Sequence, residues 1–314
     1  FAKDLSSFEF EYGDKRYRFN RYSNTVTELQ KQEEEDKEVV YSWMKYSPNK
    51  KYILYAKNYN LFVKGNKAMG MDTTEVQLTF DGEKDFSYGN SRAEREITNP
   101  NNEVATDAMW CPDNRHVFIV KDDDRKLSNL WVINSLDNKP SLTTYKYEFA
   151  GDKYLTQNEL VIIDIENRTC KKAEVDKWKD QYISFVHVTP DSKLVFFERV
   201  KRTWDEVDLI SVNTSTLEVK TVIHEVDKPY RDPHAKSISI LNNGKDILFR
   251  SERTGWGHYY HYDGDGNLKN AITSGKWVAG NICAIDTLKR VVYLYGYGKE
   301  KNINPHYYTV YKAH

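Results

Sequence analysis

Cysteine is scarce in this sequence. The 314 residues include three cysteines, Cys111, Cys170 and Cys283, which are far apart and odd in number. Such a set cannot form a disulfide framework, and without a C-x-x-C pair it does not indicate a zinc site. We therefore predict that all three are small buried hydrophobic side chains. No metal or other cofactor is expected.

Long apolar runs and a strong excess of charge are also missing. No window approaches the roughly 20 apolar residues that a membrane-spanning helix needs, and no signal-peptide pattern opens the chain. The formal net charge is -1, whereas binding to a phosphate backbone needs a strongly basic face. Neither nucleic acid nor a membrane span is therefore expected. The chain begins with Phe1 rather than methionine, which predicts a processed or truncated polypeptide.

Aromatic residues, by contrast, are abundant. The sequence has 23 Tyr, 13 Phe and 7 Trp. Aromatic side chains favour the half-buried surfaces of pleated sheets, so the composition leans towards β-structure. Charged residues make up 30% and hydrophobic residues 39% of the chain, which is typical of a soluble globular protein. No segment shows a helical period beyond a turn or two.

One unit of antiparallel strands recurs along the chain. It consists of an apolar entry, a polar turn, a hydrophobic strand, a second turn and a partner strand. The turns of the first four units are Ser47-Pro48-Asn49, Cys111-Pro112-Asp113, Thr189-Pro190-Asp191 and Asn242-Asn243-Gly244. A fifth, more degenerate unit begins at Ile282, and two hairpin-like runs occupy residues 8–29.

The order of the strands predicts the fold. The partner strand of the second unit is predicted at Leu130–Ile133 and that of the third unit at Asp208–Val212. Between these units, Leu160–Ile165 is predicted to supply outer strands of another blade. A meander of this kind cannot bury its own face, and radial stacking leaves only short edges. The sequence therefore predicts an all-β fold, a β-propeller of four-stranded antiparallel blades, in a single domain over residues 1–314.

The best-defined stretch, Phe249–Trp277, identifies a family. It reads SERTGWGHYYHYDGDGN and then ITSGKW. This pattern resembles the N-terminal domain of dipeptidyl-peptidase IV, which has Ser-Glu-x-x-Gly-Trp-x-His-Leu-Tyr followed by Leu-Thr-x-Gly-x-Trp. The matching residues are Ser251, Glu252, Gly255, Trp256, His258, Tyr260, Thr273, Gly275 and Trp277. Tyr259 departs from the pattern, because the family prefers leucine there. The resemblance extends over roughly residues 40–312.

The resemblance implies a larger protein. In this family an eight-bladed propeller precedes an α/β-hydrolase domain with a Ser-Asp-His triad, and the enzyme removes dipeptides with Pro or Ala in second place. About six blade-like units are recognisable here, which predicts a propeller truncated at its N-terminus and lacking the hydrolase domain. The implied partners are peptides with a free N-terminus, the covalently linked hydrolase domain and a second copy in a homodimer. The implied location is the periplasm or the cell surface.

The sequence lacks one catalytic motif of this family and departs from one of its binding motifs. The nucleophile elbow G-x-S-x-G is absent, so the chain itself is predicted not to be an enzyme. The family holds the substrate ammonium with a motif that resembles Asp-Trp-x-Tyr-Glu-Glu. Here Asp85–Tyr88 begins in that manner, but Gly89-Asn90 follow. Glu94 and Glu96 are candidate substitutes, because residues two apart on an extended segment face the same way. Alternatively, they are surface charges paired with neighbouring arginines.

Together these patterns predict a non-catalytic propeller domain that gates and orients peptide substrates. Two alternatives remain: a stand-alone propeller scaffold that binds protein or glycan partners, and an inactive peptidase homologue. Within the family stretch, Trp256 is predicted to pack between sheets. Glu252 and His258 are predicted to satisfy turn or neighbouring groups. Asp263–Asn267 is predicted to be a hairpin turn, because it lacks the later ligands of a calcium loop.

Overall fold

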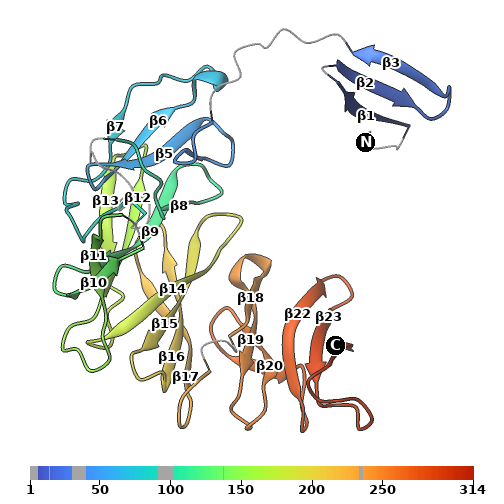
Figure 1. Ribbon diagram of the computed structural model, residues 1–314. Helices are drawn as coiled ribbons and strands as arrows, with labels where there is room; N and C mark the ends of the chain where they lie inside the picture. Colours follow the sequence, from blue (N-terminus) through green and yellow to red (C-terminus); the bar gives the residue numbers. More distant parts are fainter. Residues whose placement is uncertain (1–5, 14, 30–39, 91–101, 137, 233–235) are drawn as a thin grey trace. The chain divides into compact units, whose positions relative to one another are not determined.

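Strands make up nearly all of the regular secondary structure (Figure 1). The computed structural model describes residues 6–13, 15–29, 40–90, 102–136, 138–232 and 236–314. These described residues contain no α-helix and only single 3₁₀ turns, so the all-β prediction is confirmed. Contacts divide the chain into two compact units, Phe1–Ser42 and Trp43–His314. The single-domain prediction stays a prediction.

The first unit holds a three-stranded antiparallel sheet. Its strands pair in the order β1 (Ser7–Tyr12), β2 (Lys15–Asn20) and β3 (Thr25–Leu29). Gly13 and Asn24 adopt left-handed φ angles of 59° and 53° in the two connections, where glycine and asparagine are the residues that tolerate this conformation. The predicted hairpins over residues 8–29 are therefore confirmed.

The described residues of the second unit form five meander sheets, called blades 1 to 5, and one two-stranded ribbon. Blade 1 is β4 (Lys45–Tyr46), β5 (Tyr52–Lys57), β6 (Asn60–Gly65) and β7 (Val76–Gln77), with the 3₁₀ turn η1 (Lys67–Met69) after β6. Blade 2 is β8 (Met109–Trp110), β9 (His116–Asp123), β12 (Gln157–Asp164) and β13 (Thr169–Ala173). Blade 3 is β14 (Gln181–Val188), β15 (Leu194–Lys201), β16 (Glu206–Asn213) and β17 (Val219–Val226).

Blades 4 and 5 complete the second unit. Blade 4 is β18 (Ile238–Leu241), the 3₁₀ turn η3 (Asn242–Gly244), β19 (Asp246–Ser251), β20 (His258–Asp263) and β21 (Leu268–Ala271). Blade 5 is β22 (Val278–Asp286), β23 (Val291–Tyr297) and β24 (Tyr308–Ala313). Every pairing is antiparallel and follows a meander, which is the construction of propeller blades.

The ribbon corrects the predicted strand pairing of blade 2. Its two strands, β10 (Ser128–Asn134) and β11 (Ser141–Tyr147), pair only with each other. The partner of β9 is β12 along its whole length, so the pairing predicted for Leu130–Ile133 is wrong. The strand predicted at Leu160–Ile165 belongs to this same blade rather than to another one. The ribbon is therefore an insertion within blade 2.

Apolar side chains fill each junction between consecutive blades. Pairs that share one buried cluster at the four junctions are Leu54 with Ile119, Phe118 with Phe197, Phe196 with Phe249, and Leu248 with Leu294. A central strand such as β12 buries both of its faces, since Val161 lies in the junction with blade 1 and Leu160 in the junction with blade 3. The continuous apolar run of β12 suits this position, whereas the ribbon strands are largely exposed.

Side chains in the first turns of blades 2 and 3 each bind the first turn of the preceding blade. The amide oxygen of Asn114 accepts a hydrogen bond from the backbone N–H of Asn49 at 2.7 Å. The hydroxyl of Ser192 accepts one from the backbone N–H of Asp113 at 2.9 Å in the same way. Asn114, Ser192 and Gly244 occupy equivalent turn positions with φ of 63°, 59° and 82°. Because Gly244 has no side chain, the series of links ends at blade 3.

Hydrogen bonds and an ion pair hold together the stretch Phe249–Trp277 in blade 4. His258 is buried, and its Nε2 donates to the carbonyl of Gly275 at 2.9 Å. Its Nδ1 lies 3.0 Å from the hydroxyl oxygen of Thr273, within hydrogen-bond distance. Glu252 pairs with Arg250 at 3.1 Å. Both residues satisfy neighbouring groups, as predicted.

The buried tryptophan of this stretch is not the predicted one. Trp256 follows Gly255, whose φ is 81°, in the turn before β20, and it is 38% exposed. Trp277 is 5% exposed instead, and its ring lies 5.4 Å from that of His258 and 5.3 Å from that of Tyr311. The prediction that Trp256 packs between sheets is wrong, because a turn residue at the sheet end does not face the junction.

Two smaller predictions have opposite outcomes. The carboxylate of Asp263 accepts hydrogen bonds from the backbone N–H groups of Asp265 and Asn267, which confirms the hairpin turn. Cys111 is buried as expected, but Cys170 and Cys283 are exposed. The prediction of three buried cysteines is therefore wrong for two of them, because both lie on exposed positions of sheet strands.

Candidate functional site

The two candidate ammonium ligands, Glu94 and Glu96, lie outside the residues that the structure describes. Their role as a carboxylate pair therefore stays a prediction. Of the motif that precedes them, Phe86 and Tyr88 are described and are buried.

Hydrogen bonds place Tyr88 and the chain near residue 104 beside blade 1. The hydroxyl of Thr106 donates to the carbonyl of Tyr88 at 2.6 Å. Val104 forms an isolated antiparallel bridge with Ala56 of β5, with two backbone hydrogen bonds of 2.9 Å. These contacts fix both flanks of residues 91–101 next to the strand edge of β5.

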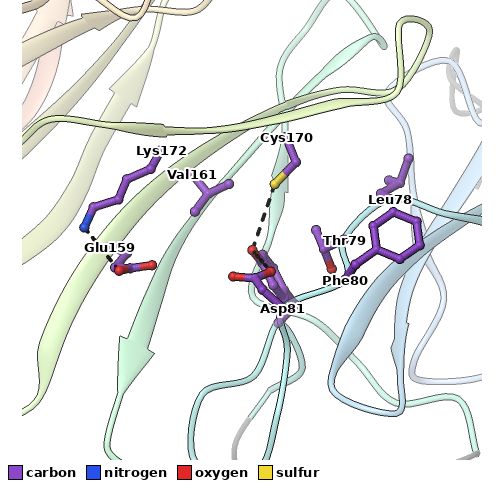
Figure 2. A pocket seen from close by; sticks show the side chains of 9 residues that line it. Leu78, Thr79, Phe80, Asp81, Glu159, Val161, Cys170 and Lys172 are labelled. Atoms are coloured by element: carbon purple, nitrogen blue, oxygen red, sulfur yellow. Dashed lines mark hydrogen bonds and ion pairs between the residues drawn. The ribbon is translucent and has the colours of Figure 1, made fainter.

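A pocket of about 370 Å³ opens between blades 1 and 2, beside Tyr88 (Figure 2). Blade 1 contributes the segment after β7, including Phe80 and Asp81, and blade 2 contributes Glu159 and Lys172 from β12 and β13. Glu159 and Lys172 form an ion pair of 3.1 Å across one wall. The pocket therefore combines an apolar rim with groups of both charges.

Asp81 is the centre of the polar network in this pocket. One carboxylate oxygen accepts from the hydroxyl of Tyr88 at 2.8 Å, and the other accepts from the ammonium of Lys121 at 2.8 Å. The Lys121 side chain is fully buried, whereas that of Asp81 is 58% exposed. The ammonium also lies 3.3 Å from the ring centre of Phe86 and 4.2 Å from that of Tyr88. The buried cation is thus compensated by a carboxylate and two aromatic faces.

The environment sets the protonation of these groups. Burial lowers the pKa of Lys121, and the hydrogen bond to Asp81 opposes that change. Burial raises the pKa of Tyr88, so its phenol remains a hydrogen-bond donor. Burial alone would raise the pKa of Asp81, but the hydrogen bonds from Lys121 and Tyr88 bring it below its ordinary value. Asp81 is therefore ionised at neutral pH and can accept hydrogen bonds from a ligand. These groups form a binding arrangement rather than a nucleophile with its base.

Sequence analysis missed this network, although one signal was present. Lys121 interrupts the apolar run of β9, HVFIVKDD. A charged residue in a strand that is buried on both faces needs a partner. The position of that partner, Asp81, could not be read from the sequence because the two residues belong to different blades.

The described residues provide little support for other kinds of site. They contain no group of three or more His, Cys, Asp or Glu side chains that could hold a metal ion. A separate search of the same residues finds no helix with the length and apolar character needed to cross a membrane.

Comparison with known protein families shows to which family the chain belongs. The sequence matches the family model described as "Dipeptidyl peptidase IV (DPP IV) N-terminal region" over residues 3–314. The chain belongs to this family. The match extends the resemblance seen in residues 40–312 to almost the whole sequence. The first unit and the five blades therefore belong to a dipeptidyl peptidase IV N-terminal region.

Individual proteins and structures of this kind share only a modest sequence identity with the chain. The probable dipeptidyl peptidase 4 of Trichophyton verrucosum is 28% identical over 102 residues, which are 32% of this chain and 14% of that protein. The crystal structure of Porphyromonas gingivalis dipeptidyl peptidase 4 is similar with a TM-score of 0.69 and 21% identity, covering 98% of this chain and 42% of that one. A putative dipeptidyl aminopeptidase IV from Bacteroides ovatus gives a TM-score of 0.60 and 16% identity, with 94% and 41% covered.

These structural similarities support the dipeptidyl peptidase IV propeller as the fold. At such identities they do not transfer an activity. The chain spans less than half the length of the two bacterial proteins. The activity of the whole relatives therefore enters only as a proposal.

Proposed function

We propose that this chain is the non-catalytic propeller region of a dipeptidyl peptidase IV-like serine peptidase. In this proposal it gates and orients peptide substrates for a covalently linked α/β-hydrolase domain. The family match over residues 3–314 is the observation that supports it. The absence of G-x-S-x-G from the sequence is consistent with serine chemistry on that other domain. We also propose that the protein is exported to the periplasm or the cell surface. Cell fractionation of the native host would test this location.

Recognition of a free peptide N-terminus is the specific task proposed for Glu94 and Glu96. Charge-assisted hydrogen bonds between an ammonium and carboxylates are about twice as strong as neutral ones. Acetylation removes the charge and two of the donors. The contacts on either side of residues 91–101 support this role, because Tyr88 before them is bonded to Thr106 after them, close to the bridge between Val104 and Ala56.

A peptide-binding experiment tests this assignment. Isothermal titration of the chain with Gly-Pro-Ala should show binding, and the N-acetylated peptide should bind at least about tenfold more weakly, because about 1.4 kcal/mol of differential interaction suffices. The Glu94→Gln/Glu96→Gln double variant should lose this preference. Glu166→Gln, in the exposed turn after β12, is the matched control and should keep it.

Three results would count against the proposal. Equal affinity for the free and acetylated peptides would reject recognition of the N-terminus. A preference that survives in the double variant would reject the two glutamates while leaving such recognition intact. Release of p-nitroaniline from Gly-Pro p-nitroanilide by the chain alone, sensitive to a serine reagent, would reject the non-catalytic assignment.

The ribbon β10–β11 supports the proposed homodimer. Trp131, Ile133 and Leu142 project from the same face of the ribbon, as their strand register shows, and are between 61% and 68% exposed. Exposed apolar patches of this kind mark interaction sites on soluble proteins. A second copy is a suitable occupant, because two such flat faces can cover each other symmetrically.

Sedimentation velocity would measure this association. The unaltered chain should sediment as a dimer at micromolar concentration, and Trp131→Ser/Ile133→Ser should raise the dissociation constant at least about tenfold, since buried aromatic anchors dominate interfaces. Val132→Ser on the other ribbon face is the matched control and should change it little. A monomeric unaltered chain, or an equal effect of both variants, would refute the interface.

A further inference from the structure

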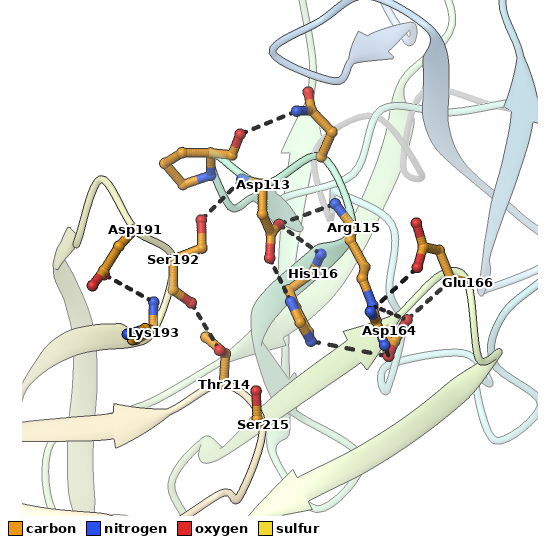
Figure 3. Close-up of polar contacts among 12 residues, drawn as sticks. Asp113, Arg115, His116, Asp164, Glu166, Asp191, Ser192, Lys193, Thr214 and Ser215 are labelled. Carbon is orange, nitrogen blue, oxygen red and sulfur yellow. Dashed lines mark hydrogen bonds and ion pairs between the residues drawn. The ribbon is translucent and has the colours of Figure 1, made fainter.

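A second cavity, of about 320 Å³, lies at the outer edge of the junction between blades 2 and 3. Blade 2 lines it with residues of β9, β12 and β13, and blade 3 lines it with the turn between β16 and β17. Figure 3 shows the polar groups around it, including His116 and Asp164 from blade 2 and Thr214 and Ser215 from blade 3. Neither the peptide-binding role nor the ribbon uses this cavity.

The one carboxylate in the cavity wall, Asp164, is already neutralised. It accepts hydrogen bonds from Nε and Nη2 of Arg115 at 3.0 and 2.6 Å. It also accepts from the backbone N–H groups of Glu166 and Asn167 at 3.0 and 3.1 Å, and from the side-chain amide of Asn167 at 2.8 Å. The Arg115 hydrogen bonds hold the pKa of Asp164 well below its usual range. Asp164 therefore remains a carboxylate, and its charge does not dominate the cavity.

The imidazole of His116 is held in a fixed orientation. Its Nδ1 lies 2.6 Å from a carboxylate oxygen of Asp113 (Figure 3). An ionised carboxylate only accepts hydrogen bonds, so Nδ1 carries the proton. The other nitrogen, Nε2, lies 4.0 Å from Asp164 and remains available to a ligand. The side chain is only 13% exposed, so this group is built into the cavity wall.

Strand β13 supplies an ammonium on the same side. Successive residues of a strand face opposite ways, so Thr169 and Lys171 line this cavity whereas Cys170 and Lys172 line the pocket beside blade 1. Lys172 is paired with Glu159. Lys171 has no ion pair within the described part of the chain. Its charge, with the hydroxyls of Thr169 and Ser215, is therefore available to an anion.

We propose that this cavity binds the phosphate group of a small phosphate monoester. Lys171 provides the charge, and the hydroxyls of Thr169 and Ser215 donate hydrogen bonds to the oxygen atoms. Nε2 of His116 forms a hydrogen bond with a hydroxyl of the organic group, which inorganic phosphate and sulfate lack. The cavity has room for an organic group besides the anion. Because Lys171 and Ser215 belong to different blades, the bound ligand also joins blades 2 and 3.

Isothermal titration with three probes tests the proposal: glucose 6-phosphate, inorganic phosphate and sulfate, at neutral pH and low salt. Glucose 6-phosphate should bind more tightly than either inorganic anion, because only its organic group also contacts the cavity wall. Lys171→Ala should weaken binding of glucose 6-phosphate at least fivefold. Lys172→Ala is the matched control, because it removes the same charge from the adjacent residue on the opposite face. It should change the affinity less than twofold.

Each other result would overturn the inference. No binding of glucose 6-phosphate would remove the site, and equal losses in the two lysine variants would indicate attraction by general surface charge. Binding of either inorganic anion as tightly as glucose 6-phosphate would reject the contact between His116 and the organic group. If Lys171→Ala does not fold, as judged by circular dichroism, Ser215→Ala serves as the second variant. It should weaken binding at least threefold, and unchanged affinity would contradict the proposal.

Discussion

Replacement of Trp277 by alanine is expected to lower the free energy of unfolding by about 3–5 kcal/mol, the usual cost of removing a large buried aromatic side chain. Trp277 is 5% exposed in the junction between blades 4 and 5. Its indole N–H donates to the carbonyl of Ser274 at 2.7 Å, and its ring contacts His258 and Tyr311. Alanine would leave a cavity and remove the hydrogen bond to the carbonyl of Ser274.

The same experiment on Trp256 provides the control. Trp256→Ala should change the free energy of unfolding by less than about 1 kcal/mol, because the residue lies in an exposed turn. Urea denaturation followed by circular dichroism measures both variants under the same conditions. Similar losses for the two tryptophans would contradict the placement of Trp277 at the junction.

The second large effect is expected at Asp208. Its carboxylate is fully buried in blade 3 and accepts from Arg199 at 2.6 Å, from Lys177 at 2.9 Å and from His224 at 2.7 Å. Asp208→Asn should lower the free energy of unfolding by about 3–5 kcal/mol, because removing one partner leaves the other charges uncompensated. Arg199 is itself buried, so its charge cannot be fully hydrated once the carboxylate is lost. The exposed pair of Asp265 and Lys220 is the control, and Asp265→Asn should change stability by less than about 0.5 kcal/mol.

The Asp208 effect should also depend on pH. Burial alone would raise the pKa of Asp208, but the hydrogen bonds from Lys177 and Arg199 leave it below its ordinary value. A lowered pKa in the folded state stabilises the protein above the unfolded value, which is about 3.9. That contribution is lost as the pH falls through the folded-state pKa. The difference between the unaltered chain and Asp208→Asn should therefore shrink on acidification from pH 7 towards pH 3, and a difference that grows would contradict this network.

Local sequence patterns predicted the parts of the fold that local chemistry determines. The turns at Pro112 and Pro190 were identified because proline and a following aspartate restrict the backbone to few conformations. The strand Asp208–Val212 was identified for a similar reason, since a short polar connection joins it to the preceding strand. In each case the information lies within about ten residues of the chain.

The errors concern contacts between distant segments. Leu130 and Leu160 both begin apolar strands after β9, and nothing in either segment specifies which one pairs with it. The choice depends on the two junctions that β12 fills. The role of Lys121 likewise depends on Asp81 in the neighbouring blade, and the burial of Trp277 rather than Trp256 depends on blade 5. Such partners are determined by packing and cannot be read from one strand.

The ribbon inserted in blade 2 has a consequence for the order of folding. In blade 3, residues 202–205 connect β15 to β16, whereas in blade 2 residues 124–156 connect β9 to β12. If the longer connection is flexible, the loss of chain entropy on closing it costs about 2 kcal/mol more free energy than closing the connection in blade 3. The ribbon reduces this cost when it forms first, because the pairing of Ser128 with Tyr147 brings the two ends of the connection together. Blade 2 is therefore expected to complete its sheet later than blade 3. This step should appear as a slow folding phase, which would become slower if the ribbon did not pair.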